Sequence, residues 1–135
     1  LDIGCGYGYS SAVIARMAEA VVAVDSDDER AADTQTTLTE MGADNVIVQA
    51  GVLAEGAPEH GPYDAITVQG GVEQVPQAIL DQLKEGGRIA CLFMDGALGV
   101  VRIGYKIDGD VNWRFSFNAA APVLAGFERE TVFSL

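Results

Sequence analysis

Asp2 and three glycines at every second position, Gly4, Gly6 and Gly8, stand at the start of the sequence. An acidic and an apolar residue precede the glycines, as at the end of a short strand, and the stretch from Ser10 resembles a helix opening. Glycine tolerates positive φ and lets a ligand touch the backbone. A helix start adds unpaired N–H groups and partial positive charge. This combination predicts a corner that binds a phosphate or carboxylate.

The spacing of the glycines narrows the choice of ligand. The dinucleotide fingerprint is Gly-x-Gly-x-x-Gly. Counted from Gly4, its third glycine falls on Tyr9, and counted from Gly6 it falls on Ser11. Neither register fits, so a nicotinamide-dependent oxidoreductase is disfavoured. A glycine turn without any ligand is the other reading that a short motif leaves open.

A second acidic residue, Asp25, ends the apolar run Ala20-Val21-Val22-Ala23-Val24. Such a run is typical of a strand buried on both faces of a parallel sheet. Asp25 is then expected at the carboxyl edge of the sheet, where ligands of open α/β sheets bind. Its carboxylate can accept two hydrogen bonds from a ribose diol. Capping of the next helix is the alternative, but Ser26 and Asp27 offer that cap too.

Strand and helix patterns alternate along the part of the chain that must position these residues. Short apolar runs predict strands over 46–48, 63–68 and 88–94, besides the one that ends at Asp25. Helices are expected from 10 to about 18, from the capping region 26–28 to about 41, and from Pro76 to the Gly86-Gly87 pair. Residues 69–73 are expected to form a loop.

The pattern changes after Asp95-Gly96. Strands are predicted over 98–107 and 111–117 around Asp108-Gly109-Asp110, a hairpin signal, and a last short strand over 128–133. Trp113, Phe115 and Phe117 alternate, which predicts one buried strand face. The expected fold class is therefore α/β: one doubly wound, Rossmann-like sheet over residues 1–135, mostly parallel, with an antiparallel C-terminal hairpin edge.

Composition excludes several function classes. The chain has 20 acidic against 8 basic residues and no basic cluster, which disfavours a nucleic-acid partner. The sequence contains no run of 18 apolar residues, so no membrane-spanning segment is predicted. Cys5, Cys91 and the single His60 are too scattered for a metal site or a disulfide framework and indicate a reduced, cytoplasmic protein. Because the sequence starts inside a strand without Met, a preceding segment is expected.

Three separated blocks carry a family resemblance. The Asp2-x-Gly4-x-Gly6-x-Gly8 pattern, with Asp25, resembles the first motifs of class I S-adenosylmethionine-dependent methyltransferases. The stretch Leu83-Lys84-Glu85-Gly86-Gly87-Arg88 is similar to the one before their fifth strand. The blocks 8–16, 42–46, 63–66 and 74–84 further resemble protein-L-isoaspartate O-methyltransferases. The resemblance covers positions 1 to about 107.

The resemblance implies a methyl transfer from S-adenosylmethionine to an isoaspartyl carboxylate of a damaged protein or peptide, leaving S-adenosylhomocysteine. Another small carboxylate is the alternative acceptor. Gly4, Gly6 and Gly8 would line the methionyl end of the cofactor, and Asp25 its ribose. The full set of implied cofactor-binding residues is Asp2, Gly4, Cys5, Gly6, Tyr7, Gly8, Asp25, Ser26, Gly51 and Val52. No catalytic or metal-binding residue is assigned, because a carboxylate acceptor is already ionised at neutral pH.

The chain also departs from the family pattern. Ala50 stands where the family has an Asp that contacts the adenine, and Tyr7 replaces a small polar residue of the glycine turn. Residues 69–73 lack the usual small-residue run that ends in Pro, the tail 118–135 is dissimilar, and the family's upstream substrate serine has no counterpart. These departures support a second hypothesis, a catalytically degenerate module that binds the cofactor or a partner.

Overall fold

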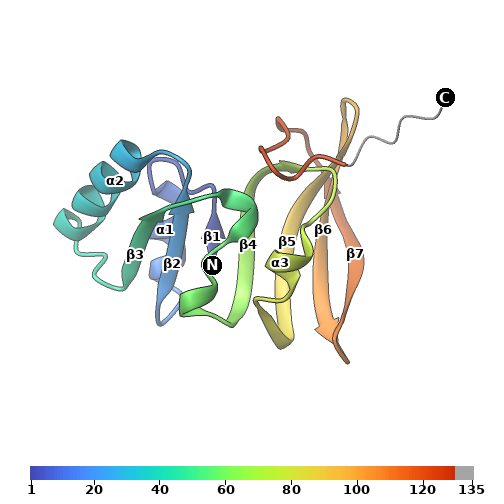
Figure 1. Cartoon of the computed structure of the whole chain (residues 1–135), viewed down its shortest axis with the longest axis horizontal. Coiled ribbons are helices and arrows are strands. Elements are labelled where there is room, and N and C mark those ends of the chain that lie inside the picture. The colour runs from blue at the N-terminus through green and yellow to red at the C-terminus, as the bar shows by residue number, and fades with distance from the viewer. Residues whose placement is uncertain (130–135) are drawn as a thin grey trace.

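A computed structural model describes residues 1–129 of the chain. These residues form a seven-stranded sheet in the order β3-β2-β1-β4-β5-β6-β7, which Figure 1 shows from left to right. The strands are β1 Asp2–Ile3, β2 Val21–Asp25, β3 Val46–Ala50, β4 Tyr63–Val72, β5 Leu83–Asp95, β6 Leu98–Ile107 and β7 Asp110–Asn118. The strands β1 to β5 pair in parallel, and β6 and β7 add antiparallel. The predicted fold class is confirmed.

Short helices pack on both faces of this sheet. They are α1 Tyr9–Ala15, α2 Asp28–Glu40 and α3 Gln77–Leu80, with the 3₁₀ helices η1 Leu53–Glu55 and η2 Pro58–His60. Successive strand residues point to opposite faces, so Val21 and Ala23 join one buried cluster, with α1 and α2. Val22 and Val24 join the other, with η1 and α3. None of the described helices is long and apolar enough to cross a membrane.

The third helix is much shorter than predicted. It ends at Leu80, and β5 already begins at Leu83, so the expected cap at Gly86-Gly87 is wrong. Residues distant in sequence hydrogen-bond to the backbone of this stretch. The Tyr63 N–H donates to the Gln82 carbonyl at 2.7 Å. Lys106 Nζ donates to the carbonyls of Leu80 and Leu83 at 3.0 and 2.9 Å. These contacts come from β4 and β6, which no local pattern reveals.

The expected loop over 69–73 belongs largely to β4, which runs to Val72. Its register against β5 shifts between Thr67 and Gly71, and Gly70 has a φ of +146°. The tail supplies the partner: the Gly71 N–H donates to the Pro122 carbonyl at 2.8 Å, and the Leu124 N–H donates to the Gly71 carbonyl at 2.9 Å. The tail thus pairs with β4 through one isolated parallel β-bridge between Gly71 and Val123. The strand predicted over 128–133 lies largely outside the described residues.

The aromatic alternation of β7 does not make one buried face. Trp113 packs edge-on against Phe93 with 4.8 Å between ring centroids, whereas Phe115 and Phe117 are 65% and 56% exposed. Phe115 pairs with Arg102 and Phe117 with Val101, so the register shifts by one residue between them. A one-residue bulge interrupts the alternation of side chains between the two faces of a sheet, so the spacing of the three aromatic residues does not define one face.

Candidate functional site at the carboxyl edge of the sheet

The glycine turn leads from β1 into α1 at the carboxyl edge of the parallel strands. Gly4, Gly6 and Gly8 have φ values of +78°, +56° and +83°, a region that other residues adopt only with strain. The Gly4 N–H donates to the Val24 carbonyl at 2.8 Å, which fixes the turn beside the end of β2. Thr34 of α2 donates its hydroxyl to the Gly6 carbonyl at 3.0 Å. The turn is therefore held by both neighbouring elements.

Gly6 opens onto free space and its neighbours do not. A Cβ at Gly6 would meet no atom within 4 Å, whereas a Cβ at Gly8 would lie 2.5 Å from Thr34 Cγ2. At Gly4 it would lie 3.2 Å from the Gln69 carbonyl and 3.6 Å from Leu124 Cδ1. The backbone of the turn is thus accessible at its middle, where a ligand could approach.

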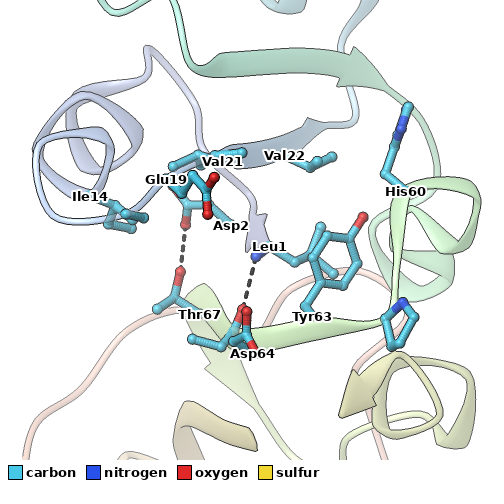
Figure 2. A pocket seen from close by; sticks show the side chains of 14 residues that line it. Leu1, Asp2, Ile14, Glu19, Val21, Val22, His60, Tyr63, Asp64 and Thr67 are labelled. Carbon is cyan, nitrogen blue, oxygen red and sulfur yellow. Dashed lines mark hydrogen bonds between the residues drawn. The ribbon is translucent and has the colours of Figure 1, made fainter.

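Asp2 is fully buried and its carboxylate has four side-chain donors. Ser10 and Ser11 donate to Oδ2 at 2.7 Å each, while Thr67 and Gln69 donate to Oδ1 at 2.8 and 3.1 Å. Figure 2 shows the bond from Thr67. Asp2 therefore ties the start of α1 to β4 and positions the glycine turn. Its predicted contact with a ligand would require the exchange of one of these donors.

Asp25 lies at the end of β2 and is paired with an arginine. Arg30 donates from Nε to Oδ2 at 2.5 Å and from Nη2 to Oδ1 at 2.6 Å. This hydrogen-bonded guanidinium holds the pKa of the Asp25 carboxyl below its ordinary value. The cap of α2 is Asp27, whose carboxylate accepts the Arg30 N–H at 2.9 Å. The alternative capping role of Asp25 is therefore wrong.

The remaining predicted residues surround these two groups. Cys5 is buried, and burial, followed by the charges of Asp25 and Asp2, raises the pKa of its thiol to about 11. Tyr7 is 85% exposed, with its ring centroid 6.0 Å from the Arg30 guanidinium carbon. Ser26 is exposed beside Asp25.

The end of β3 completes the edge. Ala50 is the register partner of Asp25, and the Gly51 N–H donates to the Asp25 backbone carbonyl at 2.9 Å. Val52 follows and is 59% exposed. Gln49 and Glu55 are the two candidate replacements for the missing carboxylate at Ala50, and Gln49 donates its amide to Glu59 at 3.1 Å. The structure therefore gathers the predicted residues at the adjoining ends of β1, β2 and β3.

Sequence reasoning missed four residues that contribute to this edge. Arg30 could have been found as the cation one turn into the helix that follows Asp25. Thr67 and Gln69 stand out as polar residues in an otherwise apolar strand pattern. Leu124, which packs beside Gly4 and Gly70, had no signal, because the tail contacts are 50 or more residues distant in sequence.

Two cavities of the described residues lie away from the glycine turn, although Asp2 and Thr67 also line the first of them. One of about 560 Å³ is lined by residues at the opposite, amino ends of the strands, among them Leu1, Val21 and Tyr63 (Figure 2). The other, of about 500 Å³, lies between α1 and the turn after α2. We place the candidate site at the carboxyl edge nonetheless, because ligands of open parallel sheets bind there. Among the described residues no cluster of potential metal ligands occurs.

Comparison with known proteins identifies the family. The family model for protein-L-isoaspartate(D-aspartate) O-methyltransferase matches residues 1–100. The chain belongs to this family. As a protein-L-isoaspartate O-methyltransferase family member, it has the fold of class I S-adenosylmethionine-dependent methyltransferases, as the sequence predicted.

Relatives and solved structures agree with this assignment. The chain is 42% identical over 89 residues to protein-L-isoaspartate O-methyltransferase 1 of Syntrophobacter fumaroxidans, covering 66% of this chain and 42% of the relative. It is 39% identical over 109 residues to protein-L-isoaspartate O-methyltransferase 2 of Pelobacter propionicus, a match that covers 77% of this chain and 48% of the relative. The chain therefore spans less than half the length of these relatives.

A solved protein-L-isoaspartate O-methyltransferase superposes with a TM-score of 0.85 at 30% identity, covering 93% of this chain and 41% of that one. A second structure, described as a protein-L-isoaspartate O-methyltransferase from Plasmodium falciparum in complex with S-adenosyl-L-homocysteine, shares the fold. Its TM-score is 0.74 at 19% identity, covering 91% and 63%.

Proposed function

We propose that this chain carries the S-adenosylmethionine site of a carboxyl O-methyltransferase. The observation that supports it best is the open backbone at Gly6 beside the Asp25 carboxylate, at the end of the adjacent strand. In this proposal Gly4, Gly6 and Gly8 hold the methionyl end and Asp25 holds the ribose. The proposal includes a cytoplasmic location, which the two free cysteines favour.

The donor and acceptor groups present fit most of this cofactor. The backbone of the turn is open at Gly6, and Asp25 has carboxylate oxygens that can accept from hydroxyl groups. The adenine side fits less well, because Ala50 offers a methyl group where a carboxylate could accept a hydrogen bond from the adenine amino group. We therefore expect binding to be weak for this family.

The bound cofactor would supply an activated methyl group, and the residues of this chain would bind and orient it. Such a displacement needs alignment of the two reactants more than proton removal. A carboxylate acceptor is ionised at neutral pH and needs no base.

The proposed acceptor is the isoaspartyl carboxylate of a protein or peptide, as the names of the relatives state for those proteins. Another small carboxylate is the alternative. Methyl transfer to an isoaspartyl peptide by the intact protein tests this assignment. We expect turnover below that of an active relative assayed on the same peptide, because of Ala50 and the altered 69–73 segment. Equal turnover would show that these departures are harmless.

Calorimetry of the intact protein with S-adenosylhomocysteine tests the cofactor site. Asp25→Ala should weaken binding by about 1–3 kcal/mol, the cost of leaving buried hydroxyls without a partner. NAD should not bind, because the glycine spacing does not match. Binding of NAD without S-adenosylhomocysteine would contradict the proposal.

The degenerate module is the second candidate, and Ala50 favours it. If the missing acceptor is what limits affinity, Ala50→Asp should tighten S-adenosylhomocysteine binding about tenfold to a hundredfold, as expected for a hydrogen bond to a charged acceptor. Unchanged or weaker binding would mean that a neighbouring group already contacts the adenine.

A further inference from the structure

The Asp25 carboxylate, the proposed ribose acceptor, is hydrogen-bonded on both oxygens by a side chain of the same chain, Arg30. A carboxylate offers about four lone-pair positions. Arg30 uses one on each oxygen, at 2.5 and 2.6 Å. With this guanidinium in place, the Asp25 side chain is only 2% exposed. A ribose diol needs carboxylate acceptor positions that it can reach, so Arg30 must withdraw from at least one of the two oxygens.

Arg30 is the donor that can withdraw. The Arg30 side chain is flexible and 37% exposed, whereas the Asp25 side chain is 2% exposed. The guanidinium carbon of Arg30 already lies 6.0 Å from the ring centroid of Tyr7. Tyr7 is exposed, and its aromatic face can bind the guanidinium after it leaves the carboxylate.

We propose that Arg30 competes with ribose hydroxyls for Asp25 and thereby sets the affinity and the hydroxyl selectivity of the nucleoside site. The inference rests on the proposed function, since it takes Asp25 as the ribose acceptor. A ligand that binds one arrangement of a site has its apparent affinity reduced by the fraction of molecules in that arrangement. The Arg30–Asp25 pair lowers that fraction.

A competing role and a merely structural role of Arg30 predict opposite changes in nucleoside affinity for the substitution Arg30→Met. Arg30→Met keeps the side-chain length, suits a helix and leaves the backbone N–H that Asp27 accepts. It removes the partner of a buried carboxylate, so the folded state should lose stability. If Arg30 only supports the fold, nucleoside binding should weaken as the stability of the folded state falls. If Arg30 competes, binding should tighten while stability falls.

The experiment measures dissociation constants of the intact protein for S-adenosylhomocysteine, adenosine and 2′-deoxyadenosine, with thermal unfolding of each variant. Arg30→Met should bind S-adenosylhomocysteine and adenosine about tenfold more tightly than wild type, as expected when the competent arrangement rises from about a tenth to nearly all molecules. The gain should be small for 2′-deoxyadenosine, which lacks one hydroxyl of the diol. Lysine carries a compact charge and cannot form the two-pronged contact of arginine, so the dissociation constants of Arg30→Lys should lie between those of wild type and Arg30→Met.

Two controls separate competition from general charge effects. Arg16→Met removes the same charge from an exposed position at the end of α1 and should leave all three constants unchanged. Added salt should tighten nucleoside binding to wild type by weakening the ion pair, with a smaller effect on Arg30→Met. This salt series needs no variant, so it still decides if Arg30→Met does not fold.

The outcomes are distinguishable. If wild type binds S-adenosylhomocysteine and Arg30→Met binds it equally or more weakly, with no salt effect on wild type, the competition is overturned and the proposed function stands. If neither protein binds S-adenosylhomocysteine or adenosine, the proposed function itself falls, and this inference falls with it.

Discussion

Two buried aspartates at neighbouring strand ends have different tasks because their partners differ. Asp2 accepts from three hydroxyls and one amide, all neutral, which join α1 to β4. Asp25 accepts from a guanidinium that is partly exposed. Four neutral donors from α1 and β4 hold Asp2, which gives it a structural task, whereas Asp25 has a single, partly exposed cation as its side-chain partner, which is the basis of the proposed exchange with ribose hydroxyls.

Asp2→Asn should lower the free energy of unfolding by about 1–3 kcal/mol, because the amide N–H group faces donors that then have no acceptor. Urea unfolding monitored by circular dichroism measures the change. Asp64→Asn is the matched control, since the Asp64 side chain is 89% exposed and contacts Lys84 at 3.3 Å. The control should stay within about 0.5 kcal/mol of wild type. Equal effects of the two substitutions would contradict the role given to Asp2.

Cys5 should make the stability of the protein fall in alkaline solution. Burial raises the pKa of its thiol from 9.0 to about 11 in the folded chain. The unfolded chain therefore releases its proton first, so this contribution is fully present below pH 9 and is lost as pH rises through 11. Urea unfolding between pH 8 and 11 should show a smaller loss of stability in Cys5→Ala than in wild type. Parallel pH profiles would refute the assignment.

At the scale of elements, the glycine turn is shaped by α2 as much as by its own residues. Thr34 both donates to the Gly6 carbonyl and packs where a side chain at Gly8 would project. The turn therefore has a closed side toward α2 and an open side at Gly6. This asymmetry makes two similar substitutions differ in what they disturb.

Gly8→Ala should destabilise the fold, while Gly6→Ala should mainly weaken ligand binding. Both residues have positive φ, which costs a non-glycine residue about 1–3 kcal/mol. Alanine at Gly8 also meets Thr34 Cγ2 at 2.5 Å, so its loss of stability should be the larger. Alanine at Gly6 meets no protein atom within 4 Å but fills the proposed ligand space. Unfolding curves and S-adenosylhomocysteine calorimetry compare the pair; the reverse ranking in either assay would contradict this geometry.

At the scale of the whole molecule, the segment after β7 returns to the middle of the sheet. Phe127 is fully buried in the cluster that contains Ile3 and Val72. Its carbonyl accepts the N–H groups of Glu73 and Gln74 at 2.8 and 3.1 Å. The tail therefore closes the core, and its Leu124 packs beside Gly4 of the glycine turn.

Phe127→Ala should lower the free energy of unfolding by about 3–5 kcal/mol, as expected for a large aromatic side chain removed from a core. Phe115→Ala is the control, because Phe115 is 65% exposed, and it should change the free energy by less than about 0.5 kcal/mol. Limited proteolysis should also cleave the tail of Phe127→Ala faster than that of wild type. A neutral effect of Phe127→Ala would show that the tail does not complete the core.

The sequence by itself determined the fold class, the order of strands and helices and the position of the glycine turn. These follow from local signals: apolar runs of strand length, helix caps and glycine spacing act over a few residues and are visible in one dimension. Most of the candidate residues at the carboxyl edge followed as well, because parallel strands bring their carboxyl ends together whatever their exact pairing.

Only the tertiary structure decided the partners and registers. Asp2 finds Thr67 at a separation of 65 residues, and Gly71 pairs with Pro122 from the tail. The short α3, the extended β4 and the exposed Phe117 follow from such pairings or from a one-residue bulge, which local propensity does not encode. The same holds for Arg30. Its charge was visible in the sequence, but its two hydrogen bonds to Asp25 depend on how α2 packs against the end of β2.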